Sequence, residues 1–293
     1  MFWSADPERP RIWLMLAPML AVVVLLFGGG LFFALIQSFG YLPLIGQTAF
    51  SLGAYAAVLR QSSFLASLLL TLYIAATATV IATILAVTVA LAIRATTRGR
   101  QALSFIFQFN LPIPHLVGAV AVADVLSQSG LLARLAAAFG LIDDPGQFPV
   151  LVFDRAGVGI IAEYVWKETA FIGVTVLAVL HAIGPEYEEL ARSLGANRWQ
   201  RFRLVLLPLM LPGVLAASVI AFAFSFGAFE VPYLLGASYP QVLPVLAYKR
   251  YTAVDLAARA EAMALCVIIT LVAGAAIVAY LHVSRRYLRR ETD

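Results

Sequence analysis

Long apolar runs separated by short polar connections dominate the chain. A helix needs roughly 20 apolar residues to cross a bilayer. Six runs reach this length, at residues 12–38, 64–93, 102–126, 160–183, 208–235 and 261–284. The third run contains Asn110, Pro112 and Pro114, which predicts a kink or break near its start. We therefore predict an all-α, polytopic membrane protein with six transmembrane helices in a single membrane domain over residues 1–293.

Composition supports a membrane protein. The chain is 62% hydrophobic and 12% charged, whereas soluble domains average roughly 25% charged residues. The single cysteine, Cys266, lies inside an apolar run, so disulfides within the chain are excluded. The first run is too long for the apolar region of a cleavable signal peptide and lacks a clear cleavage site.

Basic residues gather at the ends of the apolar runs, which argues against a nucleic-acid-binding surface despite the formal net charge of +4. Thirteen arginines fall in the termini and connections on one side of the six runs, and six basic residues fall on the other side. The positive-inside rule then predicts that both termini and the connection at 185–207 are cytoplasmic. The connections at 39–63, 127–159 and 236–260 are predicted to lie outside.

The connection at 185–207 is unusual for a loop between membrane helices. Arginines that only set the topology are one interpretation, but such a loop has no need of its glutamates, among them Glu189. Gly195 suits a bend between two short helices. Trp199 and Phe202 give the second short helix an apolar face, and Pro208 suits the first turn of the next run.

The spacing in this connection resembles the EAA loop of binding-protein-dependent ABC importer permeases. It lies between the fourth and fifth of six runs, as in that family, although Leu190 stands where alanine is usual. The likeness covers roughly residues 60–285 and implies the type I permease fold, with this loop docking on an ATPase. The docking residues that it implies are Glu189, Ala191, Gly195, Ala196, Arg198 and Pro208.

The resemblance also implies partners and a location. The chain would be a permease subunit in the inner or plasma membrane, paired with a second permease chain, identical or homologous. Two ABC ATPase subunits and an extracellular or periplasmic solute-binding protein would complete the transporter. The sequence contains no Gly-x-x-x-x-Gly-Lys-Ser/Thr loop. We therefore expect no enzyme activity and no cofactor in this chain, with ATP and magnesium bound by the partner ATPase.

Charged side chains inside apolar runs are costly, so they are usually paired or functional. Glu163 and Lys167 stand four residues apart in the fourth run and share one helix face, which predicts a structural ion pair. Contact with the cargo is the alternative. His115 and His181 have no cysteine or acid at ligand spacing, and no catalytic constellation is present, so neither a metal site nor a membrane enzyme is expected.

Glu230 is placed far along the fifth run, between Gly227 and Gly236, where the helix is expected to loosen. An acid beside the rings of Phe226, Phe229 and Tyr233 suits a cation through charge attraction and cation–π contact. A role in stabilising a bent helix or an outer gate is the alternative. The segment, with the Pro-rich run at 240–245, resembles polyamine-type importer permeases.

The cargo that this resemblance implies is a polyamine such as spermidine or putrescine. The same architecture would serve ferric iron, thiamine, an aminophosphonate or a sugar. A different class of protein, an ATP-independent secondary transporter or channel, remains an alternative, although no inverted repeat is visible in the sequence.

Overall fold

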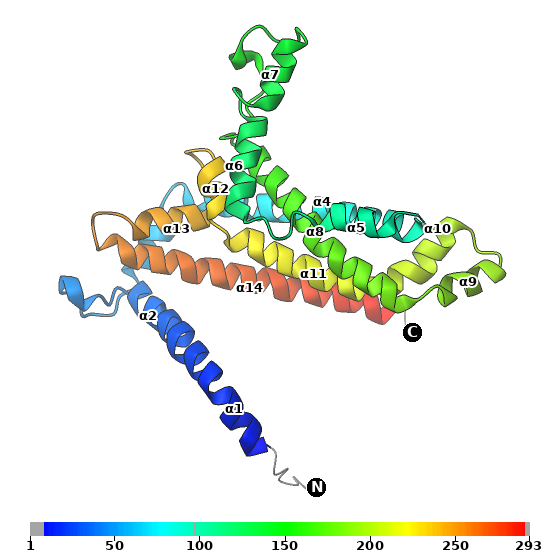
Figure 1. Ribbon diagram of the computed structural model, residues 1–293. Helices are drawn as coiled ribbons and strands as arrows, with labels where there is room; N and C mark the ends of the chain where they lie inside the picture. Colours follow the sequence, from blue (N-terminus) through cyan, green and yellow to red (C-terminus); the bar gives the residue numbers. More distant parts are fainter. Residues whose placement is uncertain (1–8, 97, 291–293) are drawn as a thin grey trace. The chain divides into compact units, whose positions relative to one another are not determined.

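The computed structural model describes residues 9–96 and 98–290, with side chains for 12–96 and 98–282. Within these ranges it is nearly all helical, and its only β-type pairing is a single bridge between Leu42 and Gln47 (Figure 1). The elements are α1 (Arg9–Val22), η1 (Val23–Gly28), α2 (Gly29–Ser38), η2 (Pro43–Ile45), α3 (Gly53–Arg60), α4 (Phe64–Ala95), α5 (Arg100–Gln108), α6 (His115–Leu126), α7 (Leu131–Ala138), η3 (Pro145–Gln147), α8 (Val158–Ile183), α9 (Glu186–Ser193), α10 (Arg198–Arg201), η4 (Phe202–Leu206), α11 (Leu207–Gly227), α12 (Glu230–Leu235), α13 (Leu243–Tyr251) and α14 (Ala258–Arg290).

Six helical segments in the described chain are long and apolar enough to cross a membrane, which confirms the predicted fold class. They span Ile12–Ser38, Phe64–Ala95, His115–Ala138, Val158–Ile183, Arg198–Gly227 and Ala258–His282. The first is continuous in spite of Gly28, because the π-helical turn η1 joins α1 to α2 without a break.

The third segment departs from the predicted run at 102–126. The predicted break is present, since α5 ends at Gln108 and α6 begins only at His115. Pro112 and Pro114 lack the N–H that a continuous helix needs, and Pro114 takes an extended conformation directly before α6. The membrane-length segment consequently starts at His115 and reaches Ala138 through α7.

Contacts divide the chain into two compact units. One unit takes the described residues up to Gln61 together with Ala247–Ile268. Inside it, the Arg250 side chain lies 3.4 Å from the carboxylate of Glu261 and 3.4 Å from the side-chain oxygen of Gln61. The guanidinium of Arg259 stacks over the ring of Tyr251 at 5.3 Å. These polar contacts connect the residue that follows α3 with α13 and the start of α14 within that unit.

The other unit runs from Ser62 to Leu246 and resumes at Ile269. Its centre is α8, which packs against α4 and α11. On α4, alanines recur every four residues at Ala78, Ala82, Ala86 and Ala90, and all four are fully buried. This spacing puts them on one face, where small side chains let neighbouring helices approach closely.

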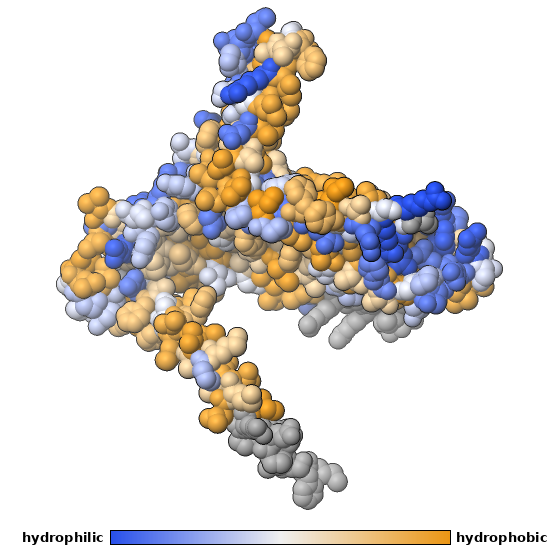
Figure 2. Space-filling view, in the orientation of Figure 1, coloured by the Kyte–Doolittle hydropathy of each residue, from blue (hydrophilic) through white to orange (hydrophobic). Residues whose placement is uncertain are grey.

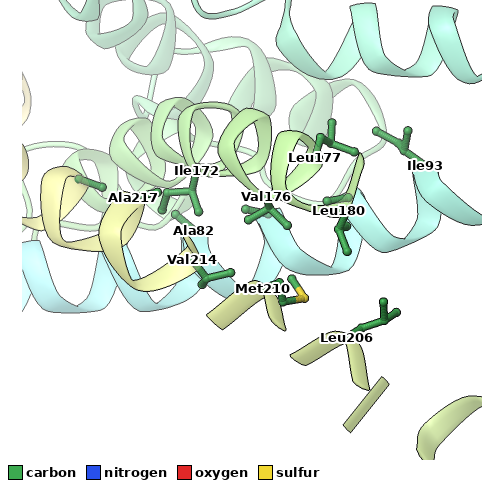
Figure 3. Close-up of a cluster of buried hydrophobic side chains, with 13 residues drawn as sticks. Ala82, Ile93, Ile172, Val176, Leu177, Leu180, Leu206, Met210, Val214 and Ala217 are labelled. Carbon is green, nitrogen blue, oxygen red and sulfur yellow. The ribbon is translucent and has the colours of Figure 1, made fainter. Parts of the chain in front are cut away.

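The space beside Ala82, Ala86 and Ala90 is filled by larger side chains from α8, α11 and η4. In Figure 3, Ile172, Val176, Leu177 and Leu180 of α8 lie with Met210 and Val214 of α11 in one cluster, with Leu206 at its edge. A second buried cluster in this unit joins α4, α6, α8 and α12. Its members include Ile74, Ala119, Tyr164, Val231 and Leu235.

The fifth membrane segment ends earlier than predicted. Helix α11 stops at Gly227, Ala228 is extended, and a separate short helix, α12, begins at Glu230. The expected loosening of the helix at Gly227 is therefore a complete break. Its consequence is that Glu230 lies beyond the end of the fifth segment and not within it.

Candidate functional site

The loop between α8 and α11 contains the two short helices α9 and α10. They join through Gly195, whose φ of +84° lies in the left-handed region that glycine adopts without strain. Asn197 then caps α10 by accepting a 2.9 Å hydrogen bond from the Gln200 N–H, while the Gln200 side chain accepts one of 2.8 Å from the Asn197 N–H. This reciprocal capping box fixes where the second helix begins. Asn197 and Gln200 stand three residues apart, which is the spacing in the sequence that signals such a cap.

The loop is fastened to the helical bundle by Arg94, in the last turn of α4. Its Nε donates to Glu188 Oε1 of α9 at 2.9 Å, and its terminal nitrogens donate to the carbonyl oxygens of Leu180 and Gly184 at the end of α8. Glu188 also lies 3.8 Å from Arg201 of α10. One arginine thus satisfies carbonyls that the end of α8 leaves unpaired and attaches α9 to α4.

The loop exposes apolar side chains on a polar element. Leu190 is 63% exposed, Leu194 82% and Trp199 63%. Figure 2 shows hydrophilic residues gathered over α9 and α10. Large apolar side chains within such a polar patch are typical of a surface that binds a protein partner.

The sequence-predicted docking residues fall on both short helices and the turn between them. Glu189, Gly195 and Arg198 are exposed, and Ala191, Ala196 and Pro208 are half-buried. Pro208 lies in the first turn of α11, directly after the π-helical turn η4, in agreement with its predicted place. Their contact with an ATPase stays a prediction.

A second polar group lies inside the bundle, around Lys167 of α8. Its Nζ donates to the carbonyl oxygens of Asn110 and Ile113 at 2.6 Å each and to that of Leu111 at 3.3 Å. These carbonyls belong to the break between α5 and α6. Backbone without helical hydrogen bonds needs partners from the protein at membrane depth, and the buried ammonium group supplies three.

In place of the predicted ion pair with Lys167, Glu163 contacts His115. The fully buried carboxylate of Glu163 lies 3.1 and 3.3 Å from His115 Nδ1. The break explains the difference, because it presents carbonyl oxygens to Lys167 and places His115, at the start of α6, over Glu163. Sequence reasoning missed this pair because 48 residues separate its members.

Glu168, next to Lys167, is also buried. Its carboxylate accepts hydrogen bonds from Ser225 Oγ of α11 and, at 3.4 Å, from Thr79 Oγ1 of α4. Together, His115, Lys167 and Glu168 line a cavity of about 380 Å³, with Phe171 and Phe224 among its apolar walls. The bundle therefore holds a cavity with groups of both charges in its lining.

The residues predicted around Glu230 divide into two places. Glu230 is exposed in the first turn of α12, and the rings of Phe229 and Tyr233 lie 6.2 Å apart beside it. Phe226 is instead fully buried and stacks on Phe222 at 5.8 Å. Three of the four predicted residues thus stay near one another, while Phe226 packs within the bundle.

Comparison with known proteins gives one family. The sequence pattern of the family described as "Binding-protein-dependent transport system inner membrane component" matches residues 78–290. Among curated proteins, the chain is 32% identical over 131 residues to a sulfate transport system permease protein of Salmonella typhimurium, which covers 45% of this chain and 44% of that protein. It is 30% identical over 175 residues to a molybdenum transport system permease protein of Mycobacterium bovis, covering 59% and 62%. The chain thus spans less than two thirds of the length of these relatives.

Solved structures of ABC transporters share the fold of this chain, and they match a larger part of it than the curated relatives do. A chain of a bacterial alginate ABC transporter, in complex with an alginate pentasaccharide-bound periplasmic protein, superposes with a TM-score of 0.81. It is 20% identical and the match covers 98% of both chains. A second structure of a bacterial ABC transporter, one involved in import of the acidic polysaccharide alginate, matches with a TM-score of 0.77 over 95% of this chain.

Proposed function

Because this chain belongs to the family of binding-protein-dependent transport system inner membrane components, we propose that it is the membrane-spanning subunit of an ATP-driven importer. In this role it forms the path for a solute and does not catalyse a covalent reaction. ATP binding and hydrolysis take place on separate subunits, and the chain converts their movement into opening of the path on one side of the membrane and then on the other.

The observation that carries this proposal is the attached but exposed loop of α9 and α10. Its apolar side chains Leu190, Leu194 and Trp199 protrude for a partner, while Arg94 holds α9 to the ends of α4 and α8. A loop that binds a moving ATPase and is fastened to two membrane helices can pass that movement into the bundle. A channel or an ion-coupled carrier has no use for such a surface.

We propose that this loop and both termini are cytoplasmic, in accordance with the excess of arginine on that side. The loop between α6 and α8 and the short helix α12 then lie at the outer face. The partners of this arrangement are two ATPase subunits, a second permease chain and a solute-binding protein at the outer face. The alginate transporter with its periplasmic protein is a structural relative with a partner of that last kind.

The cargo proposal has two candidates. A small oxyanion is favoured by the names of the relatives, which are permeases for sulfate and molybdenum. A polyamine is favoured by the exposed Glu230 beside Phe229 and Tyr233, since an acid flanked by rings suits a cation. Because the sulfate and molybdenum permeases are related in sequence to this chain, we place the oxyanion first.

ATP-dependent uptake into proteoliposomes that contain the complete transporter separates the two cargoes. Labelled sulfate, molybdate and spermidine are offered in turn, with the Glu230→Gln variant and a control, Asp143→Asn, which removes an exposed acid from the loop before α8. Spermidine uptake that falls only in Glu230→Gln supports the polyamine. Uptake of sulfate or molybdate that is equal in Glu230→Gln and Asp143→Asn supports an oxyanion as the cargo. Uptake without ATP contradicts the proposed function as a whole.

A further inference from the structure

A second cavity lies beside the loop, where the ends of α4 and α8 meet the start of α5 and the helix α9. Its volume is about 440 Å³. Leu91, Leu180 and Leu206 contribute apolar side chains to its lining. Glu189 of the predicted docking residues and the Arg94–Glu188 contact belong to its lining, but the proposed function assigns no ligand to the space between them.

The charged residues that line this cavity are predominantly basic. Four arginines line it together with only two glutamates: Arg94, Arg100, Arg192, Arg201, Glu188 and Glu189. His181 adds an imidazole. Such an excess of positive charge around one concave space attracts anions.

Two of these charges are already used within the protein. Arg94 donates to Glu188 Oε1 at 2.9 Å and to two carbonyl oxygens at the end of α8. Its guanidinium is therefore committed to holding the loop. Glu188 is shared between Arg94 and, at 3.8 Å, Arg201, so it neutralises only part of the remaining positive charge.

The other three arginines that line the cavity have N–H groups that no acceptor of the described chain fully occupies. In the described part of the chain, no hydrogen bond or ion pair engages the side chain of Arg192, and Arg100 contacts only the imidazole of His181. Nε of Arg201 is buried and has no hydrogen-bond partner among the described residues. A buried donor left unpaired is destabilising, so a ligand that accepts a hydrogen bond from Arg201 Nε would stabilise the protein.

We propose that this cavity binds a phosphate group. Guanidinium groups bind tetrahedral oxyanions through paired, charge-assisted hydrogen bonds, and three arginines with unused donors surround a single space. The group comes either from an anionic phospholipid or from free phosphate. The leucines in the lining favour the phospholipid, because they offer contact to an acyl chain, and basic pockets between membrane helices are typical sites for lipid headgroups.

The test is a binding titration on the purified full-length chain in detergent. The ligands are dihexanoyl phosphatidylglycerol, inorganic phosphate and dihexanoylglycerol, which has the same acyl chains without the phosphate. The variants are Arg100→Gln and Arg192→Gln. The control is Arg98→Gln, which removes an exposed arginine near α5 that does not line the cavity.

We expect phosphatidylglycerol to bind the wild-type chain, and each cavity variant to weaken this binding about tenfold, the loss typical of one charge-assisted hydrogen-bonded contact. Arg98→Gln leaves the affinity unchanged. If inorganic phosphate binds at the same arginines and displaces the lipid, the physiological ligand is a free anion. If phosphate fails to compete, the ligand is the lipid.

Three results overturn the proposal. The first would be a wild-type chain that binds neither phosphatidylglycerol nor phosphate. The second would be dihexanoylglycerol that binds as tightly as phosphatidylglycerol. The third would be wild-type affinity for phosphatidylglycerol in both cavity variants. The first two need no variant, so a substitution that disturbs folding does not leave the proposal untested. None depends on ATP-driven uptake, and the outcome is therefore separate from that of the proposed function.

Discussion

Replacing Lys167 with methionine removes the only side chain that the described structure places against the carbonyls of the α5–α6 break. Methionine keeps a similar length and flexibility but has no donor. The carbonyl of Asn110 keeps a hydrogen bond, because it also accepts from the Ile113 N–H at 3.1 Å. The carbonyls of Leu111 and Ile113 lose the ammonium, which contacts them at 3.3 and 2.6 Å.

The expected loss of stability follows from these two carbonyls. A fully buried polar group left without a partner costs about 1–3 kcal/mol. Both of these hydrogen bonds are only partly buried, so the gross loss is about 2–4 kcal/mol. Removing a buried ammonium recovers part of this, because its own desolvation is no longer needed. We expect the variant to be destabilised by about 1–3 kcal/mol, or roughly 2–12 °C in melting temperature for a chain of this size.

Thermal melting in detergent, followed by the loss of monodisperse protein, measures this effect. Lys249→Met is the matched control, because Lys249 is the other lysine of the chain and its side chain is exposed in α13. It should melt like the wild type. A Lys167→Met variant that melts within about 1 °C of the wild type refutes the reasoning that Lys167 stabilises the break.

Two further predictions concern the hydrogen bonds that join elements of the same unit. Arg94→Gln, which removes the ionic contact between α4 and Glu188, should lower uptake per ATP hydrolysed about tenfold in the assembled transporter; an unchanged ratio of uptake to hydrolysis contradicts a coupling role for Arg94. Ser225→Ala leaves Glu168 with only the 3.4 Å contact from Thr79, so the melting temperature should drop by an amount equivalent to about 1–3 kcal/mol; a melting temperature equal to that of wild type shows that the Ser225 contact adds nothing.

The membrane segments were predictable because their signals are local. Length and apolarity are enough to predict six membrane-length helices. The prolines of the third run mark its break, but they do not predict that the membrane-length segment begins only at His115. The end of the fifth segment was not predictable to the residue, since Gly227 and Pro232 each permit a break, and only the packing of α12 against α6 and α8 selects Gly227.

The polar contacts inside the bundle were less predictable. The spacing of Glu163 and Lys167 favours an ion pair on an isolated helix, yet each finds a better partner from the α5–α6 break, more than 45 residues away. The same holds for Arg94, whose partner Glu188 is 94 residues distant. The loop itself could be predicted from its residue spacing, whereas its fastening to α4 required the tertiary structure.

The central claim is that the loop of α9 and α10 docks on an ATPase, and one measurement tests it most directly. The tagged chain is purified from its native membrane in mild detergent, and ATP hydrolysis in the eluate is measured for wild type, Gly195→Val and Gly140→Val. Both glycines have positive φ, +84° and +67°, and open space around the position of a Cβ, so each substitution brings similar backbone strain of about 1–2 kcal/mol. The account predicts that the ATPase co-purifies with wild type and Gly140→Val and is lost from Gly195→Val. An ATPase that co-purifies equally with all three, or with none of them, contradicts it.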